Sequence, residues 1–531
     1  MHSKEIKIND ISKNTEKLSS VAVDDLMPLP WDFEDEEWSE IPEETKEQYA
    51  CILDDTCILP IPRPKTREEE EELVNKFISG MRKLFTKENN WTFLSMLETT
   101  MEHCAQCNTC SDACHIFEAS GKNEMYRPTY RSEVFRRIYK KYVKKEPLAK
   151  WRSGDVDLNW RTIARLGELA YRCNLCRRCA QTCPIGADNA LISREIRKIF
   201  SQEMGIATPE LHEKGSMLQL KVGSSTGMNK LVVTDSLEFI DEDFSEETGY
   251  EFKTPWDVEG ADILLIHNAG EIIAWPENVA AFSIIFQAAG ISWTMSSELA
   301  AYDNINYGVF YDDVQLARTA LLHAQAAKKL GVKKIVLGEC GHAHKALTVI
   351  ADRVLPGELN IPRESCFPLL RDIVMSGKIK LDPERNNFPV TMHDPCNLTR
   401  LMGIIKPQRE VLEKLCPQFR EMHPHGPFNY CCGGGSGFAI MSRNTIPEWR
   451  FKVAGRKKLE QILNAFSDCR GPETKKYLCA PCSNCKGQFR DMIEHYELLE
   501  REGLAYGGLV ELIVNAMVDV NPGFIKWEEA L

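Results

Sequence analysis

The last third of the sequence contains cysteines in three groups whose spacing is typical of metal ligation. One cysteine follows a His-Asp-Pro segment, an adjacent pair comes after 34 intervening residues, and a final group repeats every third position: Cys396, Cys431, Cys432, Cys479, Cys482 and Cys485. Thiolates grouped in this way favour soft metals, either iron–sulfur or zinc. Adjacent cysteines fit one tetrahedral ion poorly but can bind two irons of one cluster. The glycines after the pair let the backbone approach a cofactor closely.

Two further runs of cysteines share the spacing C-x2-C-x2-C-x3-C, which is typical of bacterial ferredoxins with two clusters. In that arrangement three cysteines of a run bind one cluster and the fourth binds the other. The pattern predicts one 4Fe–4S cluster on Cys104, Cys107, Cys110 and Cys183, and a second on Cys173, Cys176, Cys179 and Cys114. A structural zinc site is the alternative. His115 stands where proline is common, and we expect it to change the path of the chain and not the ligation.

Composition limits the classes of protein to which the chain can belong. Its 531 residues predict more than one domain, and we expect three. A net charge of −13 disfavours nucleic acid as a partner. No apolar run reaches the ~18 residues that span a bilayer, and the N-terminus lacks an apolar signal region. Twenty cysteines in a chain that looks cytoplasmic indicate metal binding and not disulfides.

The N-terminal 205 residues divide into an acidic part and a helical part. Residues 1–64 are acidic and contain Trp31 and Trp38, which predicts either a solvated tail or an extended arm that anchors its tryptophans on a partner subunit. Residues 65–205 are expected to form a helical ferredoxin domain. Its first helix has Thr66 as N-cap, followed by apolar residues at helical spacing, and a second helix covers about Trp91–His103.

Two segments without a metal motif lie in and after this region. Residues 121–152 hold eleven Lys and Arg against three Glu, interleaved with aromatic residues. They predict either a solvated helix face or a surface for anionic headgroups or an acidic partner. Residues 206–260 have little periodicity and are predicted to be an irregular connector.

Residues 261–531 alternate short apolar runs with helical stretches, the signature of an α/β fold. Strands are expected at Ile263–Ile266, Val309–Tyr311, Ile335–Leu337, Val390–Met392 and Tyr477–Cys479. Helices are expected at Glu277–Ala289, Val314–Leu330, Ala343–Ala351, Arg443–Phe466 and Gly487–Leu499. The fold class is therefore multidomain, α followed by α/β.

The α/β part repeats itself. Residues 262–270 align with residues 388–396, and residues 333–342 align with residues 475–484. We therefore expect a duplicated unit, with halves at 261–380 and 381–531. The first half is degenerate, because cysteines of the second half are replaced: Gly270 stands for Cys396 and Leu337 for Cys479, while Cys340 stands opposite Cys482. We therefore predict one metal cluster in the α/β part, on the C-terminal cysteines, and not two.

Several smaller signals accompany these motifs. The Cys432-Gly433-Gly434-Gly435 loop lacks the Gly-Lys-Ser/Thr of a phosphate-binding loop, so nucleotide binding is disfavoured. Cys340, His342 and His344 are either structural or face the cluster across the repeat. For Cys485 three roles are possible: a free thiol beside the cluster ligands, a ligand in one oxidation state, or an inert buried side chain. Three cysteines have no partner motif and are expected to be buried apolar thiols: Cys366, Cys416 and Cys469.

The C-terminal cysteine pattern resembles the CCG module of the heterodisulfide reductase superfamily. That resemblance implies a special, possibly noncubane, 4Fe–4S centre on Cys396, Cys431, Cys432, Cys479 and Cys482, where disulfides are reduced. From residue 66 onward, a two-cluster ferredoxin fused to a CCG module with one intact half is similar to the DsrK family, the iron–sulfur subunits of the membrane complex accompanying dissimilatory sulfite reductase. The corresponding subunits of methanogen heterodisulfide reductases and of lactate and glycolate oxidation fit less well.

The resemblance implies a catalytic subunit at the cytoplasmic face of the membrane. Its implied partners are a haem b membrane subunit that oxidises menaquinol, further subunits of the complex, and a DsrC-like small sulfur-carrier protein whose disulfide or trisulfide is reduced. Cys340, His342 and His393 are the candidate catalytic residues, since an imidazole can supply a proton to a leaving thiolate. The alternative is a subunit of another quinone-linked complex that only relays electrons.

Overall fold

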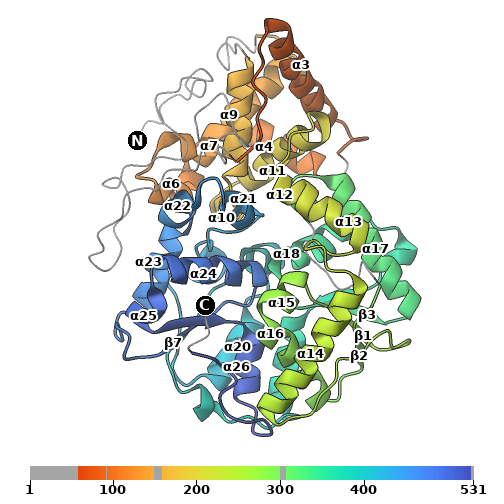
Figure 1. Cartoon of the computed structure of the whole chain (residues 1–531). Helices are drawn as coiled ribbons and strands as arrows, with labels where there is room; N and C mark the ends of the chain where they lie inside the picture. The colour runs from red at the N-terminus through yellow and green to blue at the C-terminus, as the bar shows by residue number, and fades with distance from the viewer. Residues whose placement is uncertain (1–57, 91–92, 149–157, 299–306, 528–531) are drawn as a thin grey trace. The chain divides into compact units, whose positions relative to one another are not determined.

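The computed structural model describes the chain except residues 1–57, 91–92, 149–157, 299–306 and 528–531 (Figure 1). The chain forms two compact units. Among the described residues, the first unit comprises those up to 211 with 310–312 and 433–460, and the second comprises those of 212–309, 313–432 and from 461 onward. Most of the predicted acidic arm, including Trp31 and Trp38, lies outside the described residues.

The first unit is built from helices, as the sequence predicts for the ferredoxin region. Thr66 is the N-cap of the first described helix, and its side chain accepts a hydrogen bond from the Glu69 N–H. The helices of this region are α3 (Arg67–Leu84), α4 (Leu94–His103), α5 (Thr109–Asp112), α6 (His115–Ala119), α7 (Pro128–Ile138), α9 (Trp160–Tyr171), α10 (Arg178–Thr182), α11 (Asn189–Lys198) and α12 (Pro209–Leu211). Two of these helices, α7 and α11, continue as short π-helices, η3 (Tyr139–Val143) and η4 (Ile199–Glu203). Helices α21 (Phe438–Ser442) and α22 (Pro447–Trp449) and the wider turn η13 (Arg450–Gly455) also belong to this unit.

Four aromatic residues of the basic segment lie inside the protein. Tyr126, Tyr130, Phe135 and Tyr139 are buried. Several of the basic side chains form ion pairs, among them Arg136 and Arg137 with Glu133 and Lys144 with Glu102. Helix α7 is therefore buried on nearly every side, and its Arg131 and Arg137 are buried together with its aromatic residues.

The second unit contains two four-stranded parallel sheets. The first has the strand order β2-β1-β3-β4 and the second has the order β6-β5-β7-β8. The strands are β1 (Ile263–Ile266), β2 (Trp293–Thr294), β3 (Lys334–Leu337), β4 (Arg363–Ser365), β5 (Val390–Met392), β6 (Phe419–Arg420), β7 (Lys476–Cys479) and β8 (Leu504–Gly507). Four of the predicted strands are confirmed as β1, β3, β5 and β7. The strand predicted at Val309–Tyr311 is wrong, because this apolar run forms the 3-10 turn η6 (Tyr307–Phe310).

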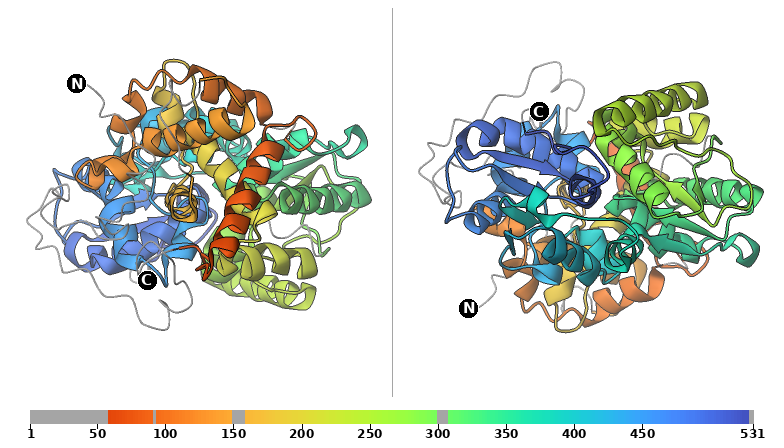
Figure 2. Two further views of the ribbon diagram at one scale, coloured as in Figure 1. Left: turned by 90° about the horizontal axis from the view of Figure 1, so that it is seen from above. Right: turned by 90° about the horizontal axis from the view of Figure 1, so that it is seen from below.

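Helices surround both sheets. The main ones in the first half are α14 (Lys230–Thr248), α15 (Ala269–Ala274), α16 (Pro276–Ala288), α17 (Asp313–Leu330), α18 (Gly341–Ala343), η7 (His344–Ile350) and α19 (Cys366–Ser376). In the second half they are η11 (Asn397–Leu401), α20 (Lys406–Leu415), α24 (Ser483–His495), α25 (Leu498–Glu502) and α26 (Leu509–Asn515). The helix α23 (Arg456–Ala465) runs from one unit into the other. Figure 2 shows the green and the blue segments of the second unit as separate groups, each with its own strands.

Helix α14 corrects one expectation. The connector predicted as irregular contains this helix of 19 residues, which begins after the N-cap Asn229. Its buried apolar side chains recur every three or four positions, as Val233, Leu237, Ile240 and Phe244. The helical period is hidden in the sequence because acidic and apolar residues also alternate on the exposed face.

The strand registers match the repeat found in the sequence. Ile266 pairs with Leu337 at the end of β1 and β3, and Met392 pairs with Cys479 at the end of β5 and β7. The sequence alignment of the two halves equates Ile266 with Met392 and Leu337 with Cys479, so each half contains the same strand pairing. The second unit is therefore a duplicated α/β unit, as predicted.

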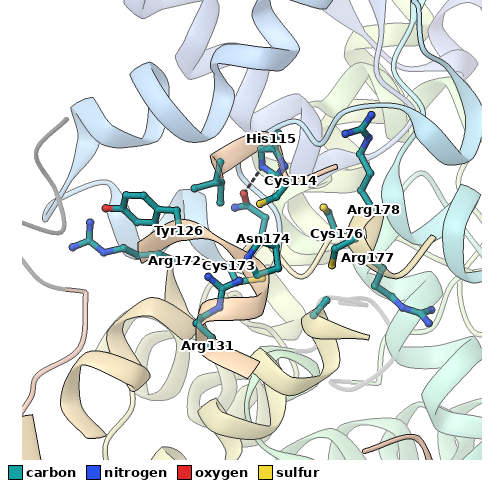
Figure 3. Close-up of a pocket in the computed structure, with 14 residues that line it drawn as sticks. Cys114, His115, Tyr126, Arg131, Arg172, Cys173, Asn174, Cys176, Arg177 and Arg178 are labelled. Carbon is teal, nitrogen blue, oxygen red and sulfur yellow. Dashed lines mark hydrogen bonds between the residues drawn. The ribbon is translucent and has the colours of Figure 1, made fainter. Parts of the chain in front are cut away.

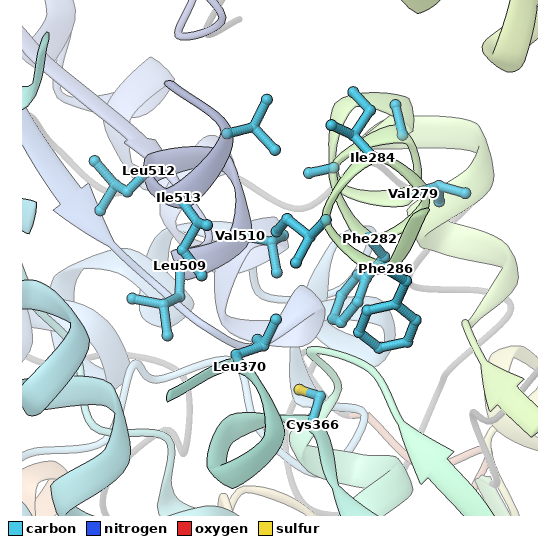
Figure 4. Close-up of a cluster of buried hydrophobic side chains, with 14 of the residues drawn as sticks. Val279, Phe282, Ile284, Phe286, Cys366, Leu370, Leu509, Val510, Leu512 and Ile513 are labelled. Atoms are coloured by element: carbon cyan, nitrogen blue, oxygen red, sulfur yellow. The ribbon is translucent and has the colours of Figure 1, made fainter. Parts of the chain in front are cut away.

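The two halves share one apolar core. Helix α16 of the first half packs against α26 of the second, and α19 lies beside them (Figure 4). Figure 4 shows Val510 of α26 beside α16, and the rings of Phe282 and Phe286 on the side of α16 that faces Cys366 and Leu370. Among the described residues, no helix is both long and apolar enough to cross a membrane.

Candidate metal centres

The two ferredoxin-type runs have the same unusual backbone. The residues on either side of the second cysteine have positive φ in both runs: Gln106 (55°) and Asn108 (61°) around Cys107, and Leu175 (48°) and Arg177 (62°) around Cys176. Left-handed residues turn the chain sharply, so successive cysteines can face one centre. A short helix then carries the third cysteine of each run, α5 in the first and α10 in the second.

The cysteines of the first predicted cluster influence one another. Burial raises the pKa of Cys110 to about 12, and Cys104 and Cys183 contribute to the increase. Burial likewise raises the pKa of Cys104, with an added contribution from Cys183. Cys107 is exposed, and its sulfur lies 3.3 Å from the Thr109 hydroxyl. The structure thus brings Cys183 of the second run to Cys104 and Cys110 of the first.

The second predicted cluster has its own cavity, shown in Figure 3. Cys114 of the first run lies in its wall together with Cys173, Cys176 and Cys179. The cavity has an empty volume of about 460 Å³, part of it open to solvent. No carboxylate lies among the described residues in its wall. Four cysteines around one space, without carboxylates, fit an iron–sulfur cluster.

His115 lies in the wall of this cavity but is held by another residue. Its Nε2 lies 2.9 Å from the Asn174 side-chain oxygen (Figure 3). Asn174 in turn donates to the Gly433 carbonyl. His115 also begins helix α6 directly after Cys114. This arrangement agrees with the expectation that His115 directs the chain and leaves the four thiolates to bind metal.

A third cluster of sulfurs lies in the second unit. The ligand atoms of His393, Cys432 and Cys485 all lie within 4.8 Å of one another, and all three residues are buried. His393 follows β5, Cys432 is the second cysteine of the adjacent pair, and Cys485 lies in the first turn of α24. The ring of His393 also packs edge-on against Phe489, at 5.1 Å between centroids.

Cys482 joins this group at the N-terminus of α24. Its pKa is lowered because the Cys485 thiol and the N–H groups of Cys485 and Gly341 donate to its sulfur, which outweighs burial. The pKa of Cys485 is raised by its hydrogen bonds to Cys432 and Cys482 and by burial. Thiolates are stabilised at helix N-termini, so the site favours a charged sulfur at Cys482.

The first half contributes Cys340 to the same place. Asn484 donates to the Cys340 sulfur at 3.5 Å, and Cys340 and Cys482 interact electrostatically. Burial is the main cause that raises the pKa of Cys340, and its side chain is fully buried. The two cysteines that the repeat aligns therefore lie at one site.

Cys479 corrects the predicted ligand set. It is buried in the apolar core with Cys416, and the groups that most affect its pKa are Glu339, Cys416, Glu511 and Lys486. The site cysteines are absent from that group. Two overlapping C-x-x-C pairs exist in the sequence, and the pair Cys482–Cys485 reaches the site because α24 begins directly after Cys482. The apolar Leu337 at the matching position of the first half was the signal that could have indicated this assignment.

The remaining CCG cysteines lie on segments that approach the site. Cys431 is buried and Cys396 is half-buried. The neighbours of Cys396, Pro395 and Asn397, lie beside Gly341, which contacts the Cys482 sulfur. Asp394 fixes this loop, because Arg409 donates to both of its carboxylate oxygens at 2.8 Å.

The candidate proton donor His342 and its neighbour His344 are both buried. Burial lowers the pKa of His342 to about 3, although Cys432 and Asn484 act in the opposite direction. Burial lowers the pKa of His344 to about 4, and its ring is held between the Cys340 carbonyl and the Ser365 hydroxyl. Both rings are neutral near neutral pH, so neither is suited to donate a proton. His393 remains among the thiols.

A buried charged network lies behind the site, and no motif in the sequence indicated it. Lys486, next to Cys485, lies 3.1 Å from Glu511, and Asn278 donates to both Glu511 and Glu339. Burial raises the pKa of Glu339 to about 8. Isolated acidic residues have no diagnostic spacing, so only the fold could reveal that they meet.

Of the three cysteines without a motif, two are buried thiols. Cys366 is fully buried and Cys416 is 2% exposed, as predicted. Cys469 is only half-buried, and its sulfur lies 3.5 Å from the Arg420 guanidinium, so the prediction of a buried thiol is wrong there.

Comparison with known proteins identifies two domains in the chain. Residues 100–187 match the family described as a 4Fe-4S dicluster domain, and residues 390–490 match the cysteine-rich CCG domain. The chain therefore carries two 4Fe–4S clusters and a CCG-type cluster. The second match covers the intact half of the duplicated unit.

Three similar proteins are iron–sulfur or heterodisulfide reductase subunits. The chain is 26% identical over 498 residues to Hdr-like menaquinol oxidoreductase iron-sulfur subunit 2 of Archaeoglobus fulgidus, with 83% of each chain covered. It is 26% identical over 470 residues to the corresponding iron-sulfur subunit of Archaeoglobus profundus, with 79% of each covered. It is 24% identical over 410 residues to one subunit of the dihydromethanophenazine:CoB–CoM heterodisulfide reductase of Methanosarcina acetivorans, covering 76% of this chain and 91% of the relative.

Proposed function

We propose that this chain, which carries a 4Fe-4S dicluster domain and a CCG domain, is the catalytic subunit of a quinone-linked disulfide reductase of the heterodisulfide reductase type. Its relatives are named as subunits of menaquinol oxidoreductases and of a heterodisulfide reductase. We extend menaquinol as electron donor to this chain, through a haem b membrane subunit. The sulfur substrate is the disulfide or trisulfide of a DsrC-like small protein, and the chain works at the cytoplasmic face of the membrane with further subunits.

The proposed ligands follow from the sulfur groups of each unit. One 4Fe–4S cluster is held by Cys104, Cys107, Cys110 and Cys183, and the other by Cys114, Cys173, Cys176 and Cys179. The CCG-type cluster is held by Cys396, Cys431, Cys432, Cys482 and Cys485. The last residue replaces Cys479, which the sequence pattern had suggested. When bound, the clusters supply electrons singly, whereas reduction of a disulfide consumes two electrons and two protons and releases two thiols.

The observation that carries this proposal is the meeting of Cys340 with the CCG cysteines. Cys340 comes from the half of the repeat that lacks the other ligands. Asn484 donates to the Cys340 sulfur, the Gly341 N–H donates to the Cys482 sulfur, and the two cysteines interact electrostatically. A thiol in that position can hold a substrate sulfur beside the cluster cysteines. His393, whose ring nitrogen lies among the sulfurs, is the candidate partner for the leaving sulfur. A subunit that only relays electrons would have no use for such a thiol.

The test compares Cys340→Ser with Cys366→Ser in the complex purified from membranes. Cys340→Ser is expected to keep the two ferredoxin-type clusters, to lower menaquinol-driven reduction of a DsrC-like disulfide strongly, and to alter the oxidised electron paramagnetic resonance (EPR) spectrum of the CCG-type centre. Cys366→Ser lies in the apolar core and is expected to change neither the turnover nor the spectrum. Unchanged turnover and an unchanged spectrum in folded Cys340→Ser would assign the chain to electron relay.

A further inference from the structure

Arginine side chains surround the cavity of Cys114, Cys173, Cys176 and Cys179. Four of them line it, as Figure 3 shows: Arg131, Arg172, Arg177 and Arg178. Two of the four have carboxylate partners close by. Arg172 lies 3.1 Å from Glu168, and Arg177 lies 2.8 Å from Asp188. The positive charges of these two are therefore balanced within the protein.

Two other buried arginines form no ion pair with any described residue. They are Arg131, which lines the cavity, and Arg197, which lies on helix α11. Arg131 is 5% exposed, and its Nε donates to the Ser193 hydroxyl at 3.3 Å. Arg197 is fully buried and donates to main-chain carbonyl oxygens, including that of Cys173 at 2.6 Å. Its other acceptors are the carbonyls of Ala170, Tyr171 and Ser436.

A buried guanidinium without an anion is costly, because removal of a charge from water takes several kcal/mol. Carbonyl oxygens satisfy its N–H groups but do not neutralise its charge. Arg131 lies in the wall of the cavity with the cysteines, and Arg197 donates to the main-chain oxygen of one of them, Cys173. Arg131 acts against burial to lower the pKa of Cys114, and Tyr171 and Cys173 act against burial to raise the pKa of Arg197.

The surroundings of the first-run cysteines are different. Cys104 lies in a pocket with Glu133 and Arg136, whose side chains form an ion pair at 2.7 Å. Arg136 lowers and Glu133 raises the pKa of Cys104, so their effects oppose each other. Cys107 is exposed to water, which screens charge. This set of cysteines therefore faces no uncompensated buried charge among the residues described around it.

We propose that Arg131 and Arg197 are the counter-charges of the cluster held by Cys114, Cys173, Cys176 and Cys179, and that they raise its reduction potential above that of the other ferredoxin-type cluster. The proposal rests on the ligand assignment of the proposed function. A gained electron makes a thiolate-bound cluster more negative, so nearby fixed positive charge favours the reduced form. When the two ferredoxin-type clusters hold one electron between them, the cluster of Cys114, Cys173, Cys176 and Cys179 is therefore the reduced one. No bond is made or broken in this transfer.

The experiment is a redox titration of the anaerobically purified protein, followed by EPR. Arg131→Gln and Arg197→Gln are each expected to lower the midpoint potential of the second-run cluster. The ratio of reduced second-run cluster to reduced first-run cluster is expected to fall at least tenfold. A tenfold change corresponds to a shift of 59 mV for a one-electron couple. Arg131→Lys keeps the charge and is expected to restore most of the potential. Cys183→Ala identifies which signal belongs to the first-run cluster.

Arg194→Gln is the matched control. Arg194 lies on the same helix α11 and is equally buried, but its charge is paired with Glu195 at 2.7 Å. Both potentials should remain as in the wild type. If Arg197→Gln fails to hold clusters, Arg131→Gln, which loses one hydrogen bond, decides the question. Intact clusters with an unchanged distribution in Arg131→Gln would overturn the proposal. Absence of two 4Fe–4S signals in the wild type would instead refute the ligand assignment.

Discussion

The main-chain N–H of Gly341 donates to the sulfur of Cys482 across 3.3 Å. Gly341 belongs to the half of the repeat that has lost its metal ligands, and Cys482 belongs to the half that keeps them. A hydrogen bond to a thiolate stabilises its charged form. The degenerate half therefore helps to set the properties of the sulfur site in the other half.

This contact makes Gly341 sensitive to added volume. A Cβ at Gly341 would lie 3.1 Å from the Cys482 sulfur and 3.8 Å from the Cβ atoms of Pro395 and Asn397. Gly341→Ala is expected to displace Cys482 and change the EPR spectrum of the CCG-type centre, with both ferredoxin-type spectra intact. Gly357→Ala, where nothing lies within 4 Å of the added atom, is the control. Identical spectra in Gly341→Ala and wild type would show that the site tolerates the methyl group.

Iron analysis tests the number of centres. We expect about twelve iron atoms per chain, four in each of three clusters, with little zinc. The reason is that eight ferredoxin-type thiolates and five CCG thiolates are available. About eight irons accompanied by one equivalent of zinc would mean that the CCG cysteines hold a structural zinc ion.

Two serine variants distinguish the overlapping C-x-x-C pairs. Cys485→Ser removes a proposed ligand and is expected to reduce the iron content to about eight per chain. Cys479→Ser places a hydroxyl in the apolar core, so it is expected to retain about twelve irons and to lose about 1–3 kcal/mol of stability. Metal analysis and thermal unfolding measure both effects. The opposite pattern of iron loss would restore Cys479 to the ligand set.

Cys183→Ala tests the exchange of cysteines between the runs. Cys183 lies with Cys104 and Cys110 and raises the pKa of both. Its loss is expected to damage the first-run cluster and leave the signal of the cluster on Cys173, Cys176 and Cys179. The reverse outcome would mean that each run binds its own cluster with all four cysteines.

The buried Glu339 predicts a dependence of stability on pH. Burial raises its pKa from the ordinary 4.5 to about 8 in the folded protein. Between these values the folded protein keeps a proton that the unfolded chain has released, so the free energy of unfolding falls as pH rises. Glu277, raised to about 7, acts in the same direction. Lys486 does not oppose this trend, because its raised pKa affects stability only at alkaline pH.

Glu339→Gln removes one of these protons. The melting temperature of the variant is expected to fall less than that of the wild type between about pH 5 and pH 9. Glu364→Gln, at an exposed position on β4, is the control and should follow the wild type. An equal decline in Glu339→Gln and wild type would mean that Glu339 is ionised in the folded protein.

Features that have a fixed period or spacing could be predicted from the sequence. The ferredoxin runs, the four central strands and the repeat all belong to this class, and the register of Ile266 with Leu337 and of Met392 with Cys479 matches the aligned halves. The four edge strands β2, β4, β6 and β8 were not predicted, and two of them, β2 and β6, are too short at two residues to show alternation. Cys479 was misassigned because spacing cannot say toward which side of a strand a side chain points.

Other features depend on contacts between distant residues. The burial that makes His342 neutral, and the approach of Lys486 to Glu511, arise from the packing of separate elements. Neither the burial nor the ion pair has a signature in the local sequence. Such contacts follow from the fold.

The packing of α16 against α26 has a consequence for how the second unit unfolds. One apolar core contains side chains from both halves, among them Phe282, Phe286, Val510 and Ile513. Neither half can expose its side of this core without exposing the other. The duplicated unit should therefore melt in one cooperative transition, and a half expressed alone should lack a stable native state. The degenerate half is kept in the chain as a folding partner, whatever it contributes to chemistry.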